Sequence, residues 1–456
     1  MSRPDLLLAS TPARIDYRYS ALGPRYLAAV LKRAGFRVEC VDGCLRRLSL
    51  ADLARAILDL NPRVLGLSLL EPSGLRVPDL LADAGFSAPV VLGGHCPTFN
   101  AERLLQRWPQ VTCMVRGEGE LTLLELLPLL LEGSDIGGVT GVAVRSGDGV
   151  VVNPCRPLIA DLDSLPFPDI EVLARDRHLV EGFALAGSRG CFGRCGFCSV
   201  QSFYALSSGR RWRCFSPGRV VDELEYLVRR FEAGKVWFLD DEFVGPKEAG
   251  RRWAAEVAEA ILGRGLKLDI TLSCRPDVVE EELFELLRRA GVTTVLLGVE
   301  SGVQAQLDRY GKGATVEENI TAILTLARLG IDARLGWIML DPACTLDEYE
   351  ANLNFLEAFD PRPVHRLTAS LDWLSIYPGT PLEKSYCLPR GVPLEDGLTY
   401  AWEFEDPRLG ELVRAARPCL DENRPRWDAI VKAHERSPRE PGALESARAY
   451  AAEYFG

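Results

Sequence analysis

Short apolar runs alternate with amphipathic stretches over the first 135 residues. The first run is Leu6 to Ser10, and Pro24 then opens a stretch with apolar residues at helical spacing, which Gly35 ends. Such alternation is typical of a parallel sheet with helices on both faces, so we expect an α/β domain of the Rossmann or flavodoxin-like type. The predicted strands are 6–10, 37–41, 64–68, 89–93 and 112–115.

Small residues and glycines gather where these strands end. Ligands of parallel sheets bind beyond the carboxyl ends of the strands. Small side chains at several neighbouring ends leave room for something broad and flat, so we expect a binding surface there. A domain that binds nothing, or only another protein, is the alternative. The candidate binding residues are Thr11, Ser68, Gly93, Gly94, His95, Gly117, Glu118 and Gly119.

Residues 136–180 have the pattern of a hairpin and a linker. Two apolar runs, 142–144 and 150–152, flank the turn sequence Ser-Gly-Asp-Gly, which predicts a β-hairpin. Pro166 and Pro168 indicate an extended connection over 161–169. We therefore predict a first domain over 1–135 and a second domain over 181–385.

The second domain again alternates strands and helices. Ser216 and Pro217 begin one helix, and Asp277 with Glu280 three residues later predicts the cap of another. Six such units predict a partial (β/α)6 TIM-like barrel, whose active site lies at the C-terminal ends of its strands. Residues 386–456 are charge-rich and predict a small helical region over the barrel mouth. The predicted strands are 183–186, 235–239, 268–273, 293–298, 333–340 and 368–374.

One glycine-rich loop places three cysteines within eight residues, at Cys191, Cys195 and Cys198. Three thiolates this close on flexible backbone can hold three corners of a 4Fe-4S cluster and leave the fourth iron open to a small molecule. A closed zinc site needs four ligands, and it would require Cys214 to fold back. Three buried structural cysteines on a turn are the other alternative.

The spacing Cys-x-x-x-Cys-x-x-Cys, with Phe197 just before the last cysteine, resembles the motif of the radical S-adenosylmethionine (SAM) superfamily. The resemblance implies a 4Fe-4S cluster on the three cysteines, with the open iron bound by the amino and carboxylate groups of SAM. It also implies that an external reductant, such as flavodoxin or ferredoxin, supplies the electron that cleaves SAM to a 5′-deoxyadenosyl radical.

Polar residues at the predicted barrel mouth suit SAM. This cofactor needs acceptors for its ammonium and its ribose hydroxyls, and a cation for its carboxylate. The Gly-x-Glu-Ser pattern that ends at Ser301 also matches the ribose-contact segment of the family, and the resemblance places Phe197 near the adenine. The predicted SAM-binding residues are Phe197, Asp240, Asp241, Ser273, Arg275 and Glu300.

The first domain is similar to the cobalamin-binding domain that precedes the radical module in many members of the superfamily. The likeness lies in Gly-Pro-x-Tyr-Leu-Ala in the first helix, Gly-Gly-His-x-Pro-Thr after the fourth strand and Arg-Gly-Glu-Gly-Glu after the fifth. It implies that the strand-end residues named above bind cobalamin. In the loop that carries Asp-x-His-x-x-Gly in some relatives, Asp16 is followed by Arg18 and Ala21, so we expect no histidine ligand to cobalt from it.

Composition and charge narrow the classes of partner that this chain is expected to bind. The chain has 456 residues and a net charge of −11, which argues against nucleic acid or an anionic membrane as the main partner. No run of eighteen apolar residues occurs, so we expect no membrane-spanning helix. Thirteen irregularly spaced cysteines indicate reduced thiols and a cytoplasmic protein.

The resemblance implies a cobalamin-dependent radical SAM enzyme, and we expect a C-methyltransferase. The 5′-deoxyadenosyl radical would take hydrogen from an unactivated carbon of a small molecule or peptide, and methylcobalamin would supply the methyl group. The alternatives are an enzyme that closes or rearranges rings, and a corrinoid-binding protein without activity. A further alternative is a methylthiotransferase with a second cluster on Cys40, Cys44, Cys96 and Cys113.

Overall fold

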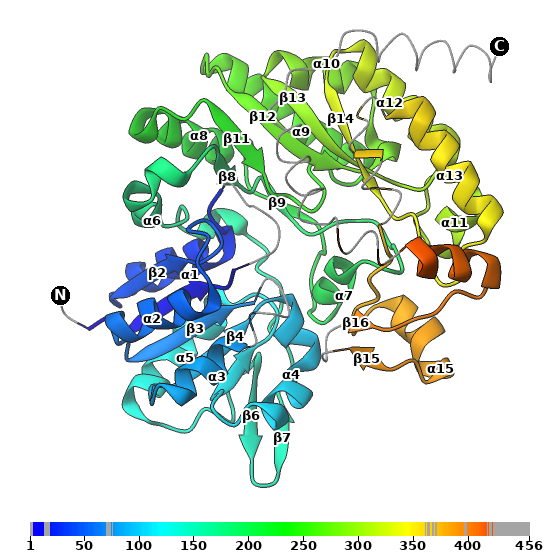
Figure 1. Cartoon of the computed structure of the whole chain (residues 1–456). Coiled ribbons are helices and arrows are strands. Elements are labelled where there is room, and N and C mark those ends of the chain that lie inside the picture. Colours follow the sequence, from blue (N-terminus) through cyan, green and yellow to red (C-terminus); the bar gives the residue numbers. More distant parts are fainter. Residues whose placement is uncertain are drawn as a thin grey trace.

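The computed structural model contains two α/β units, each built on its own sheet (Figure 1). It describes the chain except for residues 1–2, 13–18, 70–73, 75, 361, 363–364, 367–368, 370–371, 396–398, 417, 419–421 and 423–456. Both units consist mainly of parallel strands joined through helices, so the predicted α/β fold class is confirmed.

The N-terminal sheet has the strand order β2-β1-β3-β4-β5-β6-β7, and its first five strands by sequence are parallel. Side chains alternate along a strand. Leu7 and Ala9 of β1 therefore pack with α2, α3 and α4 on one face, while Leu6 and Leu8 pack with α1 and α5 on the other. The elements are β1 (Leu6–Ser10), α1 (Leu22–Arg33), β2 (Val38–Asp42), α2 (Leu50–Leu60), β3 (Val64–Ser68), α3 (Arg76–Asp83), β4 (Val90–Gly93), α4 (His95–Arg107), β5 (Cys113–Val115) and α5 (Glu120–Glu132).

The predicted hairpin forms and extends this sheet. Its strands are β6 (Val142–Ser146) and β7 (Gly149–Val152), and β6 pairs antiparallel with β5. The hairpin is thus continuous with the N-terminal sheet in the fold. The linker that follows contains the short helix α6 (Glu171–Arg175).

The second sheet has the order β14-β13-β12-β11-β8, and all of its pairings are parallel. Figure 1 shows it curving away from the N-terminal unit with helices outside. The elements are β8 (Phe183–Leu185), β9 (Ser188–Arg189), α7 (Ser199–Ala205), β10 (Arg213–Cys214), α8 (Pro217–Phe231), β11 (Lys235–Phe238), α9 (Lys247–Gly263), β12 (Asp269–Cys274), α10 (Glu281–Arg289), β13 (Val292–Glu300), α11 (Gln304–Arg309), α12 (Val316–Arg328), β14 (Asp332–Trp337) and α13 (Leu346–Phe359).

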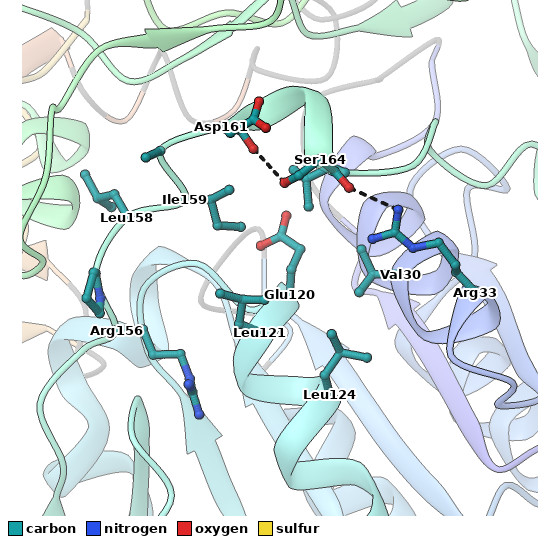
Figure 2. A pocket seen from close by; sticks show the side chains of 13 residues that line it. Val30, Arg33, Glu120, Leu121, Leu124, Arg156, Leu158, Ile159, Asp161 and Ser164 are labelled. Carbon is teal, nitrogen blue, oxygen red and sulfur yellow. Dashed lines mark hydrogen bonds between the residues drawn. The ribbon is translucent and has the colours of Figure 1, made fainter.

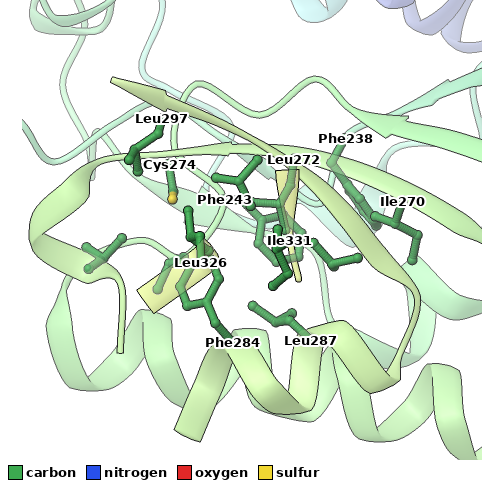
Figure 3. Close-up of a cluster of buried hydrophobic side chains, with 14 of the residues drawn as sticks. Phe238, Phe243, Ile270, Leu272, Cys274, Phe284, Leu287, Leu297, Leu326 and Ile331 are labelled. Atoms are coloured by element: carbon green, nitrogen blue, oxygen red, sulfur yellow. The ribbon is translucent and has the colours of Figure 1, made fainter. Parts of the chain in front are cut away.

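A continuous apolar core joins this sheet to its helices. Figure 3 shows Phe284 and Leu287 of α10 and Leu326 of α12 directed at side chains of β12 and β13. Local sequence sets the helix starts, because Ser216 caps α8, and Thr315 and Thr345 form capping boxes for α12 and α13.

One sequence prediction in this unit is wrong, and another can be compared with the structure only in part. Asp277 does not cap a helix: α10 begins at Glu281, and Asp277 instead pairs with Arg275. The predicted sixth strand, 368–374, falls partly on residues outside the described part. Its described residues include Trp373, which forms a single parallel bridge with Leu340 at the open edge of the sheet.

The C-terminal region is described up to about residue 416. It contains α15 (Leu388–Arg390), the strand pair β15 (Leu394–Glu395) and β16 (Thr399–Tyr400), and a helix over 407–416. Most of the predicted helical region over 386–456 therefore lies outside the described residues. Among the helices of the described part, none combines the length and apolar character that a membrane span requires.

Candidate functional site

The three cysteines lie on the loop between β9 and α7, at the carboxyl end of β8. The loop is anchored on two sides, because the Gly196 N–H donates to the Tyr310 carbonyl at 2.6 Å and the Gly196 carbonyl accepts from Leu382 N–H at 3.0 Å. Gly190 has φ +85°, and a Cβ there would lie 1.9 Å from the carbonyl oxygen of Arg211. The chain can therefore turn into the loop only with glycine at this position.

Hydrogen-bond donors surround the cysteine sulfurs. The Gly193 N–H lies 3.3 Å from Cys191 Sγ, and Arg275 Nη1 lies 3.6 Å from Cys195 Sγ. Burial raises the pKa of Cys191 to about 12, so a thiolate there needs a compensating positive charge. Three thiols, two of them with N–H groups directed at their sulfurs, fit the donor set of an iron-sulfur cluster.

The alternative metal ligands lie elsewhere. Cys214 pairs through its backbone with Ser188 and packs against the apolar core of the second unit. Cys40 and Cys113 are buried in the apolar core beneath the first sheet, as expected for strand residues. Within the described ranges, no three His, Cys, Asp or Glu side chains are placed to share one metal ion. In a cubane cluster, by contrast, each thiolate binds its own iron.

Three consecutive carboxylates follow β11 and have different roles. Asp240 is buried and accepts hydrogen bonds from Gly187 N–H at 3.0 Å and the Ser188 hydroxyl at 2.6 Å. Glu242 is fully buried and accepts from Arg275 N–H at 2.7 Å. Burial raises the pKa of Asp240 to about 7 and that of Glu242 to about 8. Both residues therefore hold neighbouring strand ends together and do not face an opening.

Asp241 is the carboxylate that stays accessible. Its side chain reaches solvent, and it accepts from Gly190 N–H at 3.1 Å. Burial among the surrounding protein atoms raises its pKa to about 6. Of the two aspartates named from the sequence, Asp241 is the one free to contact a ligand.

Arg275 has most of its donors committed to protein atoms. Its Nε donates to Asp277 at 2.7 Å and its Nη2 to the Lys312 carbonyl at 2.7 Å, and the side chain is buried. The edge formed by Nε and Nη2, one of the two that could bind a carboxylate in two places, is thus occupied. Arg275 thus lies at the predicted strand end, and its side chain contacts the cysteine loop.

Glu300 sits where β13 ends in a bulge, with φ +67°. Left-handed backbone at a residue other than glycine costs about 1 to 3 kcal/mol and concentrates at functional sites. Glu300 accepts from Lys312 Nζ at 3.0 Å. Although burial works in the other direction, the charges of Glu300 and Cys195 raise the pKa of Lys312.

Two further predicted residues lie near this edge. The ring of Phe197 packs edge-on against Tyr310, with centroids 5.7 Å apart. Ser273 is half-buried in β12, and its carbonyl accepts from Phe243 N–H at 3.0 Å. Contact of either residue with SAM stays a prediction.

The predicted cobalamin residues separate into two groups. Thr11, Ser68, Gly93 and Gly94 lie together at the carboxyl ends of β1, β3 and β4, where Thr11 N–H donates to the Ser68 carbonyl at 3.1 Å. Gly94 has φ +109° and begins α4, so the backbone turns sharply there. Thr11 is fully buried, and contact of any of these residues with cobalamin stays a prediction. Asp16 and Arg18 lie outside the described residues.

His95 connects the two units. Its ring stacks on Phe203 of α7 with centroids 4.4 Å apart and an angle of 4°, and its Nδ1 lies 3.3 Å from the Ser199 hydroxyl. Burial among protein atoms lowers the pKa of His95 to about 4, so the ring is neutral. The end of the first sheet is thereby held against the residue that follows Cys198.

Glu118 belongs to an ion network between the two units. It accepts from Arg189 at 3.1 Å and from both terminal nitrogens of Arg213 at 3.0 Å, while Glu120 accepts from Arg189 at 2.6 Å. Although burial works in the other direction, the hydrogen bond from Arg213 lowers the pKa of Glu118. The Gly117 to Gly119 loop thus anchors the strand that leads to the cysteines, a role not foreseen from the sequence.

A cavity of about 430 Å³ adjoins this network at Glu120 (Figure 2). Its walls come from α1, α5 and the linker, including Arg33, Glu120, Leu121 and Arg156. None of the residues predicted to hold a cofactor lines it within the described part of the chain. We therefore keep it separate from the candidate site.

Comparison with known proteins agrees with this arrangement. Residues 185–356 match the model of the radical SAM superfamily, and residues 12–127 match that of the B12 binding domain. An uncharacterized methyltransferase of Pyrococcus horikoshii, PH0819, is 31% identical over 345 residues, which cover 74% of this chain and 73% of that protein. The anaerobic magnesium-protoporphyrin IX monomethyl ester cyclase of Rubrivivax gelatinosus is 32% identical over 69% of this chain and 58% of that protein.

A solved structure shares the fold over almost the whole chain. The cobalamin-dependent S-adenosylmethionine radical enzyme OxsB, with aqua-cobalamin and SAM bound, superposes with a TM-score of 0.77 at 22% identity and covers 99% of this chain and 71% of that one. The two family models imply a 4Fe-4S cluster, SAM and cobalamin, and the residues described above suit these cofactors. The chain therefore belongs to the radical SAM enzymes that carry an N-terminal B12-binding domain.

Proposed function

We propose that the protein methylates an unactivated carbon of a small molecule or peptide. The observation that carries the proposal is the contact between α4 and α7, where His95 stacks on Phe203. This contact brings the strand ends of the B12-binding domain to the helix that follows Cys198. A substrate held between the two units would meet both cofactors without moving.

The cofactors carry the difficult chemistry: the cluster and SAM provide a hydrogen-abstracting radical, and cobalamin provides a methyl group. The chain's own residues bind and orient them. Cys191, Cys195 and Cys198 would hold the cluster, Asp241 would accept from the SAM amino group, and Glu300 would accept from the ribose hydroxyls. The small residues at β1, β3 and β4 would face the corrin.

A loop of the second unit, residues 378–381, reaches the first unit. Gly379 packs against Phe99 of α4 so closely that a Cβ on Gly379 would lie 2.2 Å from the Phe99 ring. The loop at residues 378–381 thus meets the B12-binding domain directly. Such a contact limits the entry of water to the radical intermediate.

The reaction requires an external one-electron reductant, and we propose a flavodoxin or ferredoxin in the cytoplasm for this role. The described cysteines are all free thiols, which suits a reducing compartment. The acidic chain, with a net charge of −11, makes nucleic acid a poor partner.

Ring closure is the second candidate, because one relative at 32% identity is named as a cyclase. The two functions differ in what happens to SAM. A methyltransferase of this kind uses SAM both as radical source and as methyl donor, and the second use releases S-adenosylhomocysteine. A cyclase needs only the first use.

The test needs no knowledge of the substrate. Protein produced with hydroxocobalamin and purified without oxygen is reduced and incubated with SAM, and both nucleoside products are quantified by mass spectrometry. We expect 5′-deoxyadenosine together with about one S-adenosylhomocysteine per bound cobalamin in the first turnover. Protein produced without cobalamin is the control and should release no S-adenosylhomocysteine. Formation of 5′-deoxyadenosine alone by the cobalamin-loaded protein would contradict methyl transfer.

A further inference from the structure

Arg275 is built into the underside of the cysteine loop. Its Nη1 lies 3.6 Å from Cys195 Sγ, and its guanidinium carbon lies 5.4 Å from the centre of the Phe192 ring. A Cβ on Gly193 would come within 2.9 Å of Nη1. The loop therefore needs glycine at 193 to let the guanidinium reach the sulfur.

The other side of Arg275 is fixed. Asp277 accepts from Nε at 2.7 Å, the Lys312 carbonyl accepts from Nη2 at 2.7 Å, and the residue is 6% exposed. These contacts leave Nη1 directed at the sulfur and occupy the edge formed by Nε and Nη2, so that of the five N–H donors only one on each terminal nitrogen has no partner among these atoms. The side chain is positioned before any ligand arrives.

We propose that Arg275 raises the reduction potential of the cluster through its charge on Cys195, and does not bind the carboxylate of SAM. Reduction adds one electron from the external reductant, which is oxidised by one electron, and no bond or proton changes at Arg275. A nearby cation stabilises the state that carries the additional negative charge, so reduction becomes easier. Burial strengthens this effect because little water screens the charge.

The charges around Arg275 predict the direction in which each substitution shifts the reduction potential of the cluster. Asp277 is the acidic partner that offsets part of the Arg275 charge, since the two form an ion pair at 2.7 Å. Lys312 is a second buried cation nearby, but Glu300 pairs with it at 3.0 Å. Removal of the Arg275 charge should therefore lower the potential, whereas removal of the Asp277 charge should raise it.

The experiment measures the midpoint potential of the cluster in SAM-free protein by redox titration followed with electron paramagnetic resonance. The variants are Arg275→Gln, Arg275→Lys and Asp277→Asn. The control is Arg264→Gln, which removes an exposed arginine that pairs with Asp222 on the outer surface. The affinity of the oxidised protein for SAM is measured in parallel by calorimetry.

In Arg275→Gln, the ratio of reduced to oxidised cluster at a fixed potential should fall about tenfold, which is 59 mV for a one-electron couple. Arg275→Lys should retain most of the native potential, Asp277→Asn should shift the ratio in the opposite direction, and Arg264→Gln should change nothing. SAM affinity should stay within about twofold of native throughout. An unchanged potential in Arg275→Gln, or a loss of SAM affinity without a shift in potential, would overturn the proposal.

If Arg275→Gln does not assemble a cluster, the Asp277→Asn variant tests the proposal. A higher reduction potential in that variant supports the proposal, and an unchanged potential refutes it. The inference rests on the cluster of the proposed function but not on methyl transfer. A native protein that assembles no iron-sulfur cluster would refute the function itself. A loaded cluster with an unchanged potential would refute only the role of Arg275.

Discussion

Glu118 and Arg189 form a buried ion pair across the two domains, with Oε1 3.1 Å from Nη1. Arg189 stands two residues before Cys191, and Glu118 lies in the loop after β5 of the B12-binding domain. Arg213 pairs with the same carboxylate at 3.0 Å. Together with Glu120 and His95, Glu118 therefore fixes the position of the cysteine loop relative to the first domain.

Glu118→Gln should destabilise the protein by about 3 kcal/mol, because it leaves the buried guanidinium of Arg213 without its carboxylate. The loss is measured from the unfolding midpoint in denaturant. We also expect a smaller yield of S-adenosylhomocysteine per 5′-deoxyadenosine, since the two cofactors would be held less firmly. The control is Glu125→Gln, which removes a half-exposed partner of Arg156 and should cost less than about 1 kcal/mol. Equal losses in the two variants would show that the Glu118 network has no special role.

Cys195→Ala should abolish cluster assembly, because two thiolates cannot hold the three corners of the cluster. Iron content should fall far below the roughly four atoms per chain expected of one cluster, and 5′-deoxyadenosine should not form. Cys214→Ser serves as the matched control, since Cys214 packs against apolar residues away from the loop. Loss of iron in Cys214→Ser, or the presence of zinc in place of iron in the native protein, would contradict the assignment.

Asp241→Asn should weaken SAM binding about tenfold at pH 7.5, a change of ~1.4 kcal/mol. The pKa of Asp241 is about 6, so the carboxylate is ionised above that pH and becomes protonated below it. Native affinity should therefore fall about tenfold between pH 7 and pH 5, and the difference between native protein and variant should disappear at the lower pH. Calorimetry with cluster-loaded protein at several pH values tests this, with Asp222→Asn on the exposed face of α8 as control. A variant as pH-dependent as native protein would exclude Asp241 from the SAM site.

Gly379→Ala should cost about 1 to 3 kcal/mol, because Gly379 has φ +84° and abuts the ring of Phe99. Phe99→Ala removes the ring and should relieve the steric part of this cost. In a double-mutant cycle, the two changes together should be less destabilising than their sum by at least about 0.5 kcal/mol. Strict additivity would mean that the loop at residues 378–381 does not press on α4.

Much of the fold follows from the pattern of apolar and polar residues along the sequence. The strands of the first sheet appear at the predicted positions because each short apolar run is buried on both faces. The difference between Asp241 and its neighbours depends on their partners. Asp240 and Glu242 are buried and accept hydrogen bonds from Gly187 and Arg275, whereas Asp241 between them is exposed.

Other roles depend on partners that are distant in sequence. Glu118 meets Arg189 across 71 positions, and Arg275 meets Cys195 across 80. Local residue type marks Arg275 equally well as a carboxylate-binding cation, and only its contacts with Asp277 and Lys312 show that one edge of its guanidinium is already used. The same contact explains the wrong cap prediction, because the Asp277 carboxylate pairs with a side chain and so does not cap the helix.

The glycine at 193 has a consequence for the history of this family. Any substitution there would push the guanidinium of Arg275 away from the sulfur, since even a methyl group would come within 2.9 Å of it. The two positions should therefore change together in descendants of a common ancestor. Relatives that lack the arginine are therefore expected to accept larger residues at this position of the loop.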